Sequence, residues 1–153
     1  MSETLSKAER VLQALHAQID ARFMLISWLV GPPQFVRGDV LPQRIPPGGV
    51  VILRDGDPGE AEVFLSPLSY SWRHLAELEM VVGGPPDQRE AVFDALRRAI
   101  GLALDHDRTL GGLCHWVEAE APAPVDLAVE GAESLKAAMV PVALHYDSDD
   151  TLL

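Results

Sequence analysis

The chain has 153 residues, the length of one ordinary domain, and 48% of them are apolar, which excludes a disordered acidic tail. Its 12 basic and 23 acidic side chains leave a formal charge of −11. Such a deficit of Lys and Arg argues against a protein that wraps duplex DNA or lies on an anionic membrane.

Cysteine content and hydropathy further narrow the class of protein to which the chain could belong. The one cysteine, Cys114, excludes an internal disulfide and a cysteine-built zinc cage within one chain. The first residues lack the features of a secretory signal, and the longest apolar stretch, 23–30, is far shorter than the ~20 residues that span a bilayer. We therefore expect a soluble, intracellular, single domain over 1–153, with flexible ends at 1–4 and 147–153.

The first predicted helix begins at Ser6, which forms a capping box with Glu9. In this motif the hydroxyl and the carboxylate accept hydrogen bonds from backbone N–H groups that have no partner within the helix. One apolar stripe at helical spacing is predicted to be buried, formed by Ala8, Val11, Leu12, Leu15, Ile19 and Phe23. Five prolines between 24 and 47 forbid a long regular element. We expect an extended connection there, with one short strand at 35–37.

Three strands are predicted in the middle of the chain. The β-branched run 50–53 indicates a buried strand, and turn residues at 55–60 would fold it back as a hairpin onto a second strand at 62–65. Alternation over 69–82 predicts a long strand. Its buried face would comprise Tyr70, Trp72, His74, Ala76, Leu78, Met80 and Val82.

A second helix and two strands complete the prediction. The helix has Asp87 as its expected N-cap. Its apolar face would comprise Val92, Phe93, Leu96, Ala99, Ile100, Ala103 and Leu104. Strands follow at 114–121 and 137–146, and Pro141, which lacks an N–H group, would place the second at a sheet edge or in a bulge. This order predicts an α+β fold with a mainly antiparallel sheet and two helices packed on one face.

Signals of enzyme chemistry are weak. The chain has no nucleophile elbow, P-loop, dinucleotide-binding fingerprint or HExxH motif. Cys114 and His115 would point to opposite faces of a strand, so a nucleophilic cysteine would need His74, His106 or His145 as its base. A buried, inert thiol is the alternative.

Two sets of acidic residues each have a functional and a structural interpretation. Glu77 and Glu79 would lie about 7 Å apart on one strand face, as an acid/base pair or as a hydrated surface. Asp55, Asp57 and Glu60 imitate the start of a calcium loop but lack its terminal glutamate, and a hairpin turn is the alternative. We expect neither a metal nor a cofactor.

Four strings in the sequence resemble a known family. They are IPPGGVVILRDGDPG at 45–59, LSPLSY at 65–70, DRTLGGL at 107–113 and PVALHY at 141–146. Together they resemble the tail-completion proteins of long-tailed phages and of phage-like gene transfer particles in alphaproteobacteria, with the tail terminators of lambda-like tails as the closest type. The resemblance covers 41–146, and the apolar, Trp-containing segment 23–35 departs from it.

The resemblance implies a structural virion assembly protein and no enzyme. Such proteins are assembled in the host cytoplasm and form a homo-hexameric ring on the finished tail tube. The ring stops the addition of tube subunits and joins the tail to the head connector at the neck. An acidic ring would let genome DNA pass through its lumen without specific binding.

Three other interpretations remain open at this point. The chain could be another neck, head-completion or tail tube protein, a small acyltransferase or hydrolase that uses Cys114, or a monomeric binding module.

Loops would supply the contacts between neighbours, because recognition sits on loops of rigid scaffolds and prolines limit the entropy lost on docking. The loop 65–70, the turn 55–60 and the acidic loop 122–133 are the candidates, with solvated loops that have no partner as the alternative. The interface candidates are Arg54, Asp55, Asp57, Pro58, Ser66, Pro67, Leu68, Pro122 and Asp126.

Overall fold

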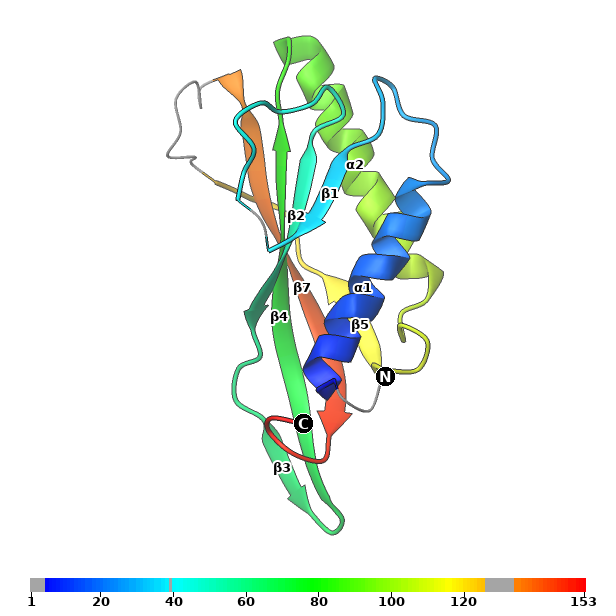
Figure 1. Ribbon diagram of the computed structural model, residues 1–153, viewed down its shortest axis with the longest axis vertical. Helices are drawn as coiled ribbons and strands as arrows, with labels where there is room; N and C mark the ends of the chain where they lie inside the picture. The colour runs from blue at the N-terminus through cyan, green and yellow to red at the C-terminus, as the bar shows by residue number, and fades with distance from the viewer. Residues whose placement is uncertain (1–4, 39, 126–133) are drawn as a thin grey trace.

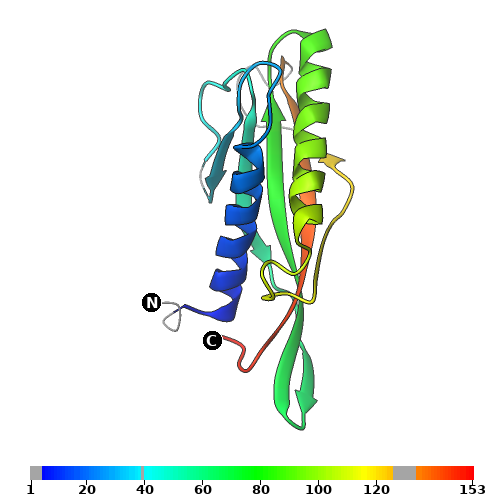
Figure 2. The ribbon, with the colours of Figure 1, turned by 90° about the vertical axis from the view of Figure 1, so that its right-hand side faces the viewer.

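The computed structural model describes residues 5–38, 40–125 and 134–153. Over these residues a twisted seven-stranded sheet is covered on one face by two helices, and one end of the sheet projects beyond the helices (Figures 1 and 2). This arrangement confirms the predicted α+β class and the placement of both helices on one face. No helix in the described part of the chain is long and apolar enough to cross a membrane.

Helix α1 (Lys7–Phe23) begins at the predicted cap, where the hydroxyl of Ser6 accepts a hydrogen bond from the N–H of Glu9 at 3.1 Å. The carboxylate of Glu9 does not return to the N-cap, so only half of the capping box forms. It accepts two hydrogen bonds from the guanidinium of Arg37, at 2.7 and 2.9 Å. These bonds hold the pKa of Glu9 below its ordinary value and join α1 to the sheet.

The strands in chain order are β1 (Gln34–Arg37), β2 (Val50–Asp57), β3 (Glu62–Leu65), β4 (Leu68–Val82), β5 (Trp116–Ala119), β6 (Ala123–Pro124) and β7 (Lys136–Ser148). The main path of the sheet over the described residues is β1-β2-β4-β7-β5, with β3 beside β4 and β6 beside β7. Every pair is antiparallel except β1 with β2, so the sheet is mixed and mainly antiparallel.

The predicted hairpin between β2 and β3 is wrong. Both strands are antiparallel to β4, so they run in the same direction along one edge of it. The segment between them moves the chain along that edge and does not reverse it. The chain reverses after β3, at Ser66 and Pro67, where β4 begins at Leu68. The predicted long loop 65–70 is therefore a tight turn.

The predicted edge position of β7 is also wrong. β7 pairs with β4 along thirteen residues, Lys136–Ser148, and has β5 and β6 on its other side. The carbonyl of Pro141 accepts a hydrogen bond from the N–H of Glu120 at 2.8 Å, so the ring nitrogen of Pro141 faces that same side. The neighbouring strand is interrupted there, between β5 and β6, and no ladder bond is lost.

Helix α2 (Pro86–His106) lies beside α1 and runs in the opposite direction (Figure 1). Its N-cap is Pro85 and not Asp87, because Pro86 lacks an N–H and has a preset φ, which suits the first helical position. The predicted apolar faces of both helices form one core with Ala76, Leu78, Met80 and Val82 of β4, and Trp72 lies partly buried at its border. Tyr70, which was also predicted to be buried, is only half-buried and lies outside this core, because the helices do not reach that end of β4. Gln18 joins the helices by hydrogen bonds from its amide to two backbone carbonyls of α2 and its C-cap.

Two predicted boundaries move. The strand expected at 114–121 is reduced to β5, because the chain turns at 107–114 before it. The end expected to be flexible from 147 onward begins inside the sheet, since Asp147 and Ser148 belong to β7. Asp147 forms an ion pair with His115 at 2.9 Å.

Candidate protein interface

The sheet projects from the body of the protein as a narrow two-stranded arm, residues 62–71 (Figure 1). Its turn carries three predicted interface residues, Ser66, Pro67 and Leu68. The side chain of Leu65 is 79% exposed, and the apolar residues next to it in β3 are about half exposed. Exposed apolar side chains gathered on one element mark an interaction site.

The arm exists because β4 is longer than the helices that cover it. Fifteen strand residues extend about 50 Å, whereas the 17 residues of α1 extend about 26 Å and the 21 residues of α2 about 32 Å. Alternation places Leu68, Tyr70 and Trp72 on the same face as the buried His74. The core face of the sheet therefore continues past the ends of the helices, and its residues change from the half-buried Trp72 and Tyr70 to the exposed Leu68.

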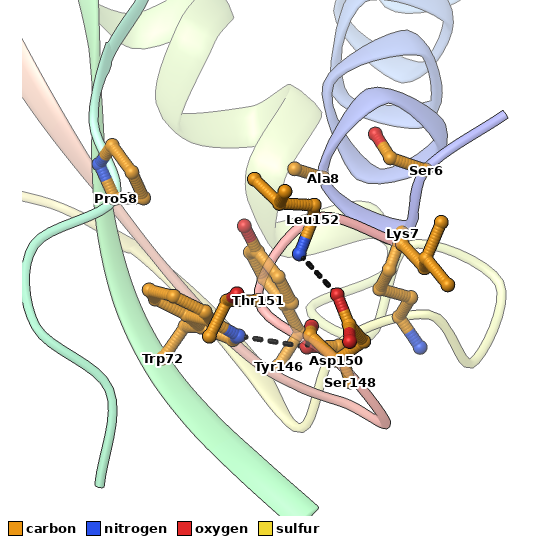
Figure 3. Close-up of a pocket in the computed structure, with 11 residues that line it drawn as sticks. Ser6, Lys7, Ala8, Pro58, Trp72, Tyr146, Ser148, Asp150, Thr151 and Leu152 are labelled. Carbon is orange, nitrogen blue, oxygen red and sulfur yellow. Dashed lines mark hydrogen bonds between the residues drawn. The ribbon is translucent and has the colours of Figure 1, made fainter.

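A pocket of about 240 Å³ lies where the arm joins the body (Figure 3). The first turn of α1, Pro58, Trp72 and the residues that follow β7 line it. The indole of Trp72 donates a hydrogen bond to the hydroxyl of Ser148 at 2.9 Å, and that hydroxyl donates to the carbonyl of Asp150 at 2.7 Å. These polar atoms are thus paired with one another, whereas Lys7 also lines the pocket.

Buried polar groups hold the base of the arm to the sheet. The imidazole of His74 lies 2.6 Å from the carbonyl oxygen of Asp55 through Nε2 and 2.8 Å from the hydroxyl of Tyr146 through Nδ1. A carbonyl only accepts, so Nε2 carries a proton, and in the neutral ring Nδ1 accepts from the tyrosine. Burial raises the pKa of Tyr146 to about 12. One side chain thus connects β2, β4 and β7.

The first group of predicted interface residues makes contacts within the chain. The guanidinium of Arg54 lies 3.4 Å from the carboxylate of Glu79, and the carboxylate of Asp55 pairs with Arg37 at 2.9 Å. The carboxylate of Asp57 accepts a hydrogen bond from the N–H that lies two residues later, at 2.8 Å. These contacts stabilise the fold, and Asp55 and Asp57 are nevertheless exposed, so their role at an interface stays a prediction.

The second group lies apart. Pro122 lines a pocket of about 240 Å³ beside α2, across the sheet from the arm. Asp126 lies outside the described residues. The structure therefore places Ser66, Pro67 and Leu68 together at the turn of the arm, Pro58 in the pocket beside Trp72, and Pro122 in a different pocket.

The apolar residues of β3 were not among the predicted interface residues. Val63, Phe64 and Leu65 are three consecutive apolar residues next to a turn, so both faces of the strand are apolar. A half-buried strand alternates instead. That departure, together with the greater length of β4, is the signal in the sequence that could have identified the arm.

Two of the residues that the sequence offered as catalytic candidates, Cys114 and Glu79, are buried or paired within the chain. Cys114 is buried in the loop before β5, and burial raises the pKa of its thiol to about 11. Glu79 is paired with Arg54 rather than with Glu77. Among the described residues, no three or more His, Cys, Asp and Glu side chains are grouped closely enough to hold a metal ion.

We expect the thiol of Cys114 to react about 100-fold more slowly than an ordinary cysteine with iodoacetamide at pH 8. A rise of the pKa from 9.0 to about 11 lowers the thiolate fraction by about that factor, and burial slows the reagent further. Mass spectrometry over time measures the rate in the native chain and in the denatured chain. A Ser66→Cys variant in a Cys114→Ser background supplies an exposed reference thiol. Native labelling at the reference rate would contradict the buried, protonated state.

No protein-family model matches the chain, and no curated protein matches it.

Proposed function

We propose that the chain is a tail terminator of a phage or gene transfer particle, a structural protein that acts by binding. Six copies form a ring on the finished tail tube, stop the addition of tube subunits and present a surface to the head-tail connector at the neck. The observation that carries the proposal is the arm, an exposed apolar element on a rigid sheet. Within the described residues β3 pairs only with β4, so its outer edge is open to another strand.

The buried groups of the protein support a binding role over covalent catalysis. A thiol with a pKa of about 11 is protonated at neutral pH and is a poor nucleophile. The buried imidazole of His74 has both ring nitrogens engaged in hydrogen bonds to Tyr146 and the backbone of Asp55. Neither group is available to a substrate in this arrangement.

The charge of the protein supports the same role. A ring built from chains of charge −11 repels the phosphates of a genome that passes through its lumen, so DNA moves without adhering. The strings at 45–59 and 65–70, which carry the resemblance to tail-completion proteins, cover β2 and the turn of the arm. The resemblance and the candidate interface therefore coincide in the chain.

Addition of the purified protein to tail tube protein of the same particle, during polymerisation, tests the proposal. We expect elongation to stop, with tube lengths measured by electron microscopy. A tail tube subunit would instead be incorporated and lengthen the tubes. Particles that lack the protein should have tails of abnormal length that are not joined to capsids. Normal tails joined to filled capsids would contradict the proposal.

Paired surface variants give this experiment an internal control. Leu65→Asp places a charge on the exposed arm and should abolish capping, because it opposes burial against a neighbour. Leu29→Asp places the same charge at another exposed leucine, 68% exposed and far from the arm in sequence, and should leave capping intact. Both variants should melt close to the unmodified protein.

A further inference from the structure

We propose that the arm of one copy docks into a groove on the helix layer of a second copy. The groove is the outward-facing pocket of about 390 Å³ lined by Ala17, Gln18, Ala21, Arg22, Leu25 and His106. This inference deepens the proposed function, on which it rests, by naming the contact between neighbours in the ring.

The arm supplies an apolar surface that its own chain leaves uncovered. Val63 lies opposite Tyr70 and Leu65 opposite Leu68, so these four side chains share the face that continues the core. Along β3 the exposed fraction rises toward the turn, from 49% at Val63 to 79% at Leu65, and Leu68 across the turn is 49% exposed. Burial of these leucines would be favourable by roughly 1.5–3 kcal/mol each if it were complete.

The groove supplies the matching concave surface. Ala17 and Ala21 lie one turn apart on α1, Leu25 follows the C-cap Met24, and the two alanines leave a depression beside the 79% exposed Leu25. On α2, Leu102 lies one turn before His106 and is itself half exposed, which extends the apolar strip along the second helix. The lining of the groove is thus partly apolar, with Gln18, Arg22 and His106 as its polar members.

The charges beside the two surfaces are opposite. Glu60 and Glu62 flank the arm, are exposed and form no ion pair within the described chain. Arg22 lines the groove, and its Nε atom is buried without a hydrogen-bond partner among the described atoms. Because each chain has a charge of −11, two copies attract only where basic side chains of one meet acidic side chains of the other.

A second arginine adds positive charge near the groove. Arg98 lies one turn before Leu102 on α2, is exposed and forms no ion pair with Asp94, which lies one turn earlier. Asp107, which follows His106, is half-buried, and its carboxylate accepts hydrogen bonds from the N–H groups of Thr109 and Gly111. Asp20 lines a separate pocket beside Trp28, and Asp105 is paired with a residue of its own chain.

The occupant of the groove is a second copy, because the arm cannot reach the groove of its own chain. The arm extends from one end of the molecule and points away from the helices (Figures 1 and 2). A contact that uses different surfaces on the two copies is heterologous, and repetition of such a contact closes into a ring when the rotation allows. The inference therefore produces the type of assembly that the proposed function requires.

Disulfide trapping between two labelled chains tests the contact directly. In a Cys114→Ser background, Leu65→Cys in one chain and Ala21→Cys in an isotope-labelled second chain should give a mixed disulfide dimer under diamide, identified by mass. Leu29→Cys in place of Ala21→Cys is the control, because Leu29 is exposed and outside the groove. Equal trapping with both partners, or trapping with neither, would overturn the proposal.

A charge exchange tests the electrostatic part. Glu62→Arg and Arg22→Glu should each weaken self-association at least about 5-fold in sedimentation equilibrium, whereas a chain with both changes should regain most of the affinity. Additive weakening in the double variant would overturn the proposed pairing. Melting curves of all three variants separate a lost contact from a lost fold.

The failure of this inference and the failure of the proposed function have different signatures. The trapping experiment contains no tail tube, so a specific arm-to-groove dimer that leaves tube growth unchanged contradicts only the proposed function. A protein that stops tube growth without an arm-to-groove disulfide contradicts only this inference.

Discussion

Replacement of Gly56 by alanine should lower the free energy of unfolding by about 3 kcal/mol or more. Gly56 has a φ of +71° and lies in a bulge where β2 gains one residue relative to β4, between Arg54 and Asp57. A Cβ atom at Gly56 would overlap the backbone carbonyl of Leu75, so the central strand would have to move. Urea denaturation followed by tryptophan fluorescence measures the loss.

Gly59 provides a matched control for this prediction. Its φ of +72° is almost the same, but a Cβ atom there would lie 3.8 Å from the nearest atom, the carbonyl oxygen of Arg73. Gly59→Ala therefore carries only the strain of a left-handed backbone, about 1–2 kcal/mol. Equal losses at the two positions would show that steric overlap at Gly56 is not the cause.

Replacement of His74 by leucine should cost about 3 kcal/mol. The change leaves the buried hydroxyl of Tyr146 and the partly buried carbonyl of Asp55 without their partner, and each orphaned group costs about 1–3 kcal/mol. Because leucine is apolar and of similar size, a large loss would come from the polar groups rather than from a cavity. A loss within about 0.5 kcal/mol would contradict the role assigned to His74.

A double-mutant cycle isolates the bond between the two side chains. Tyr146→Phe alone removes the hydroxyl and should cost about 1 kcal/mol, since the Nδ1 atom of His74 then lacks its donor. In the background of His74→Leu the same change should be nearly neutral or stabilising, because no buried hydroxyl is then left unpaired. Losses that add would mean that the two groups do not interact.

Those parts of the fold that depend on local periodicity could be predicted from the sequence. The stripe of α1 and the alternation of β4 are repeats within one element, and the structure buries the stripe from Val11 to Phe23 and the strand face from His74 to Val82. Ala8, Tyr70 and Trp72, which were also predicted to be buried, are only partly so. The cap at Ser6 and the short strand near Phe35 follow from short-range chemistry and are also present. Together with the order of elements, these features were sufficient for the α+β class.

The errors arise where a distant partner decides the structure. Residues 55–60 have the composition of a reversing turn, but β4 offers one long edge to both β2 and β3, so the same residues form a bulge and a step along that edge. Pro141 would weaken a central strand, but the break between β5 and β6 falls opposite its nitrogen. Neither partner can be identified from the local sequence.

The candidate interface was predicted in part for the same reason. Ser66, Pro67 and Leu68 were chosen as loop residues, and they lie at the turn of the arm. The exposed residues of β3 were missed because exposure depends on how far the helices reach across the sheet. Asp55 was chosen for its place in a turn, whereas its side chain and its carbonyl both stabilise the fold.

The continuity of β4 has a mechanical consequence. The strand that carries the turn of the arm at Leu68 runs without interruption to the middle of the sheet, where thirteen of its residues pair with β7. Tension applied to the tip along the strand axis loads these hydrogen bonds simultaneously in shear, instead of opening them one after another. A force on the arm is therefore distributed over the most extensive pairing in the molecule, and we expect the tip to withstand pulling while the body of the sheet remains intact.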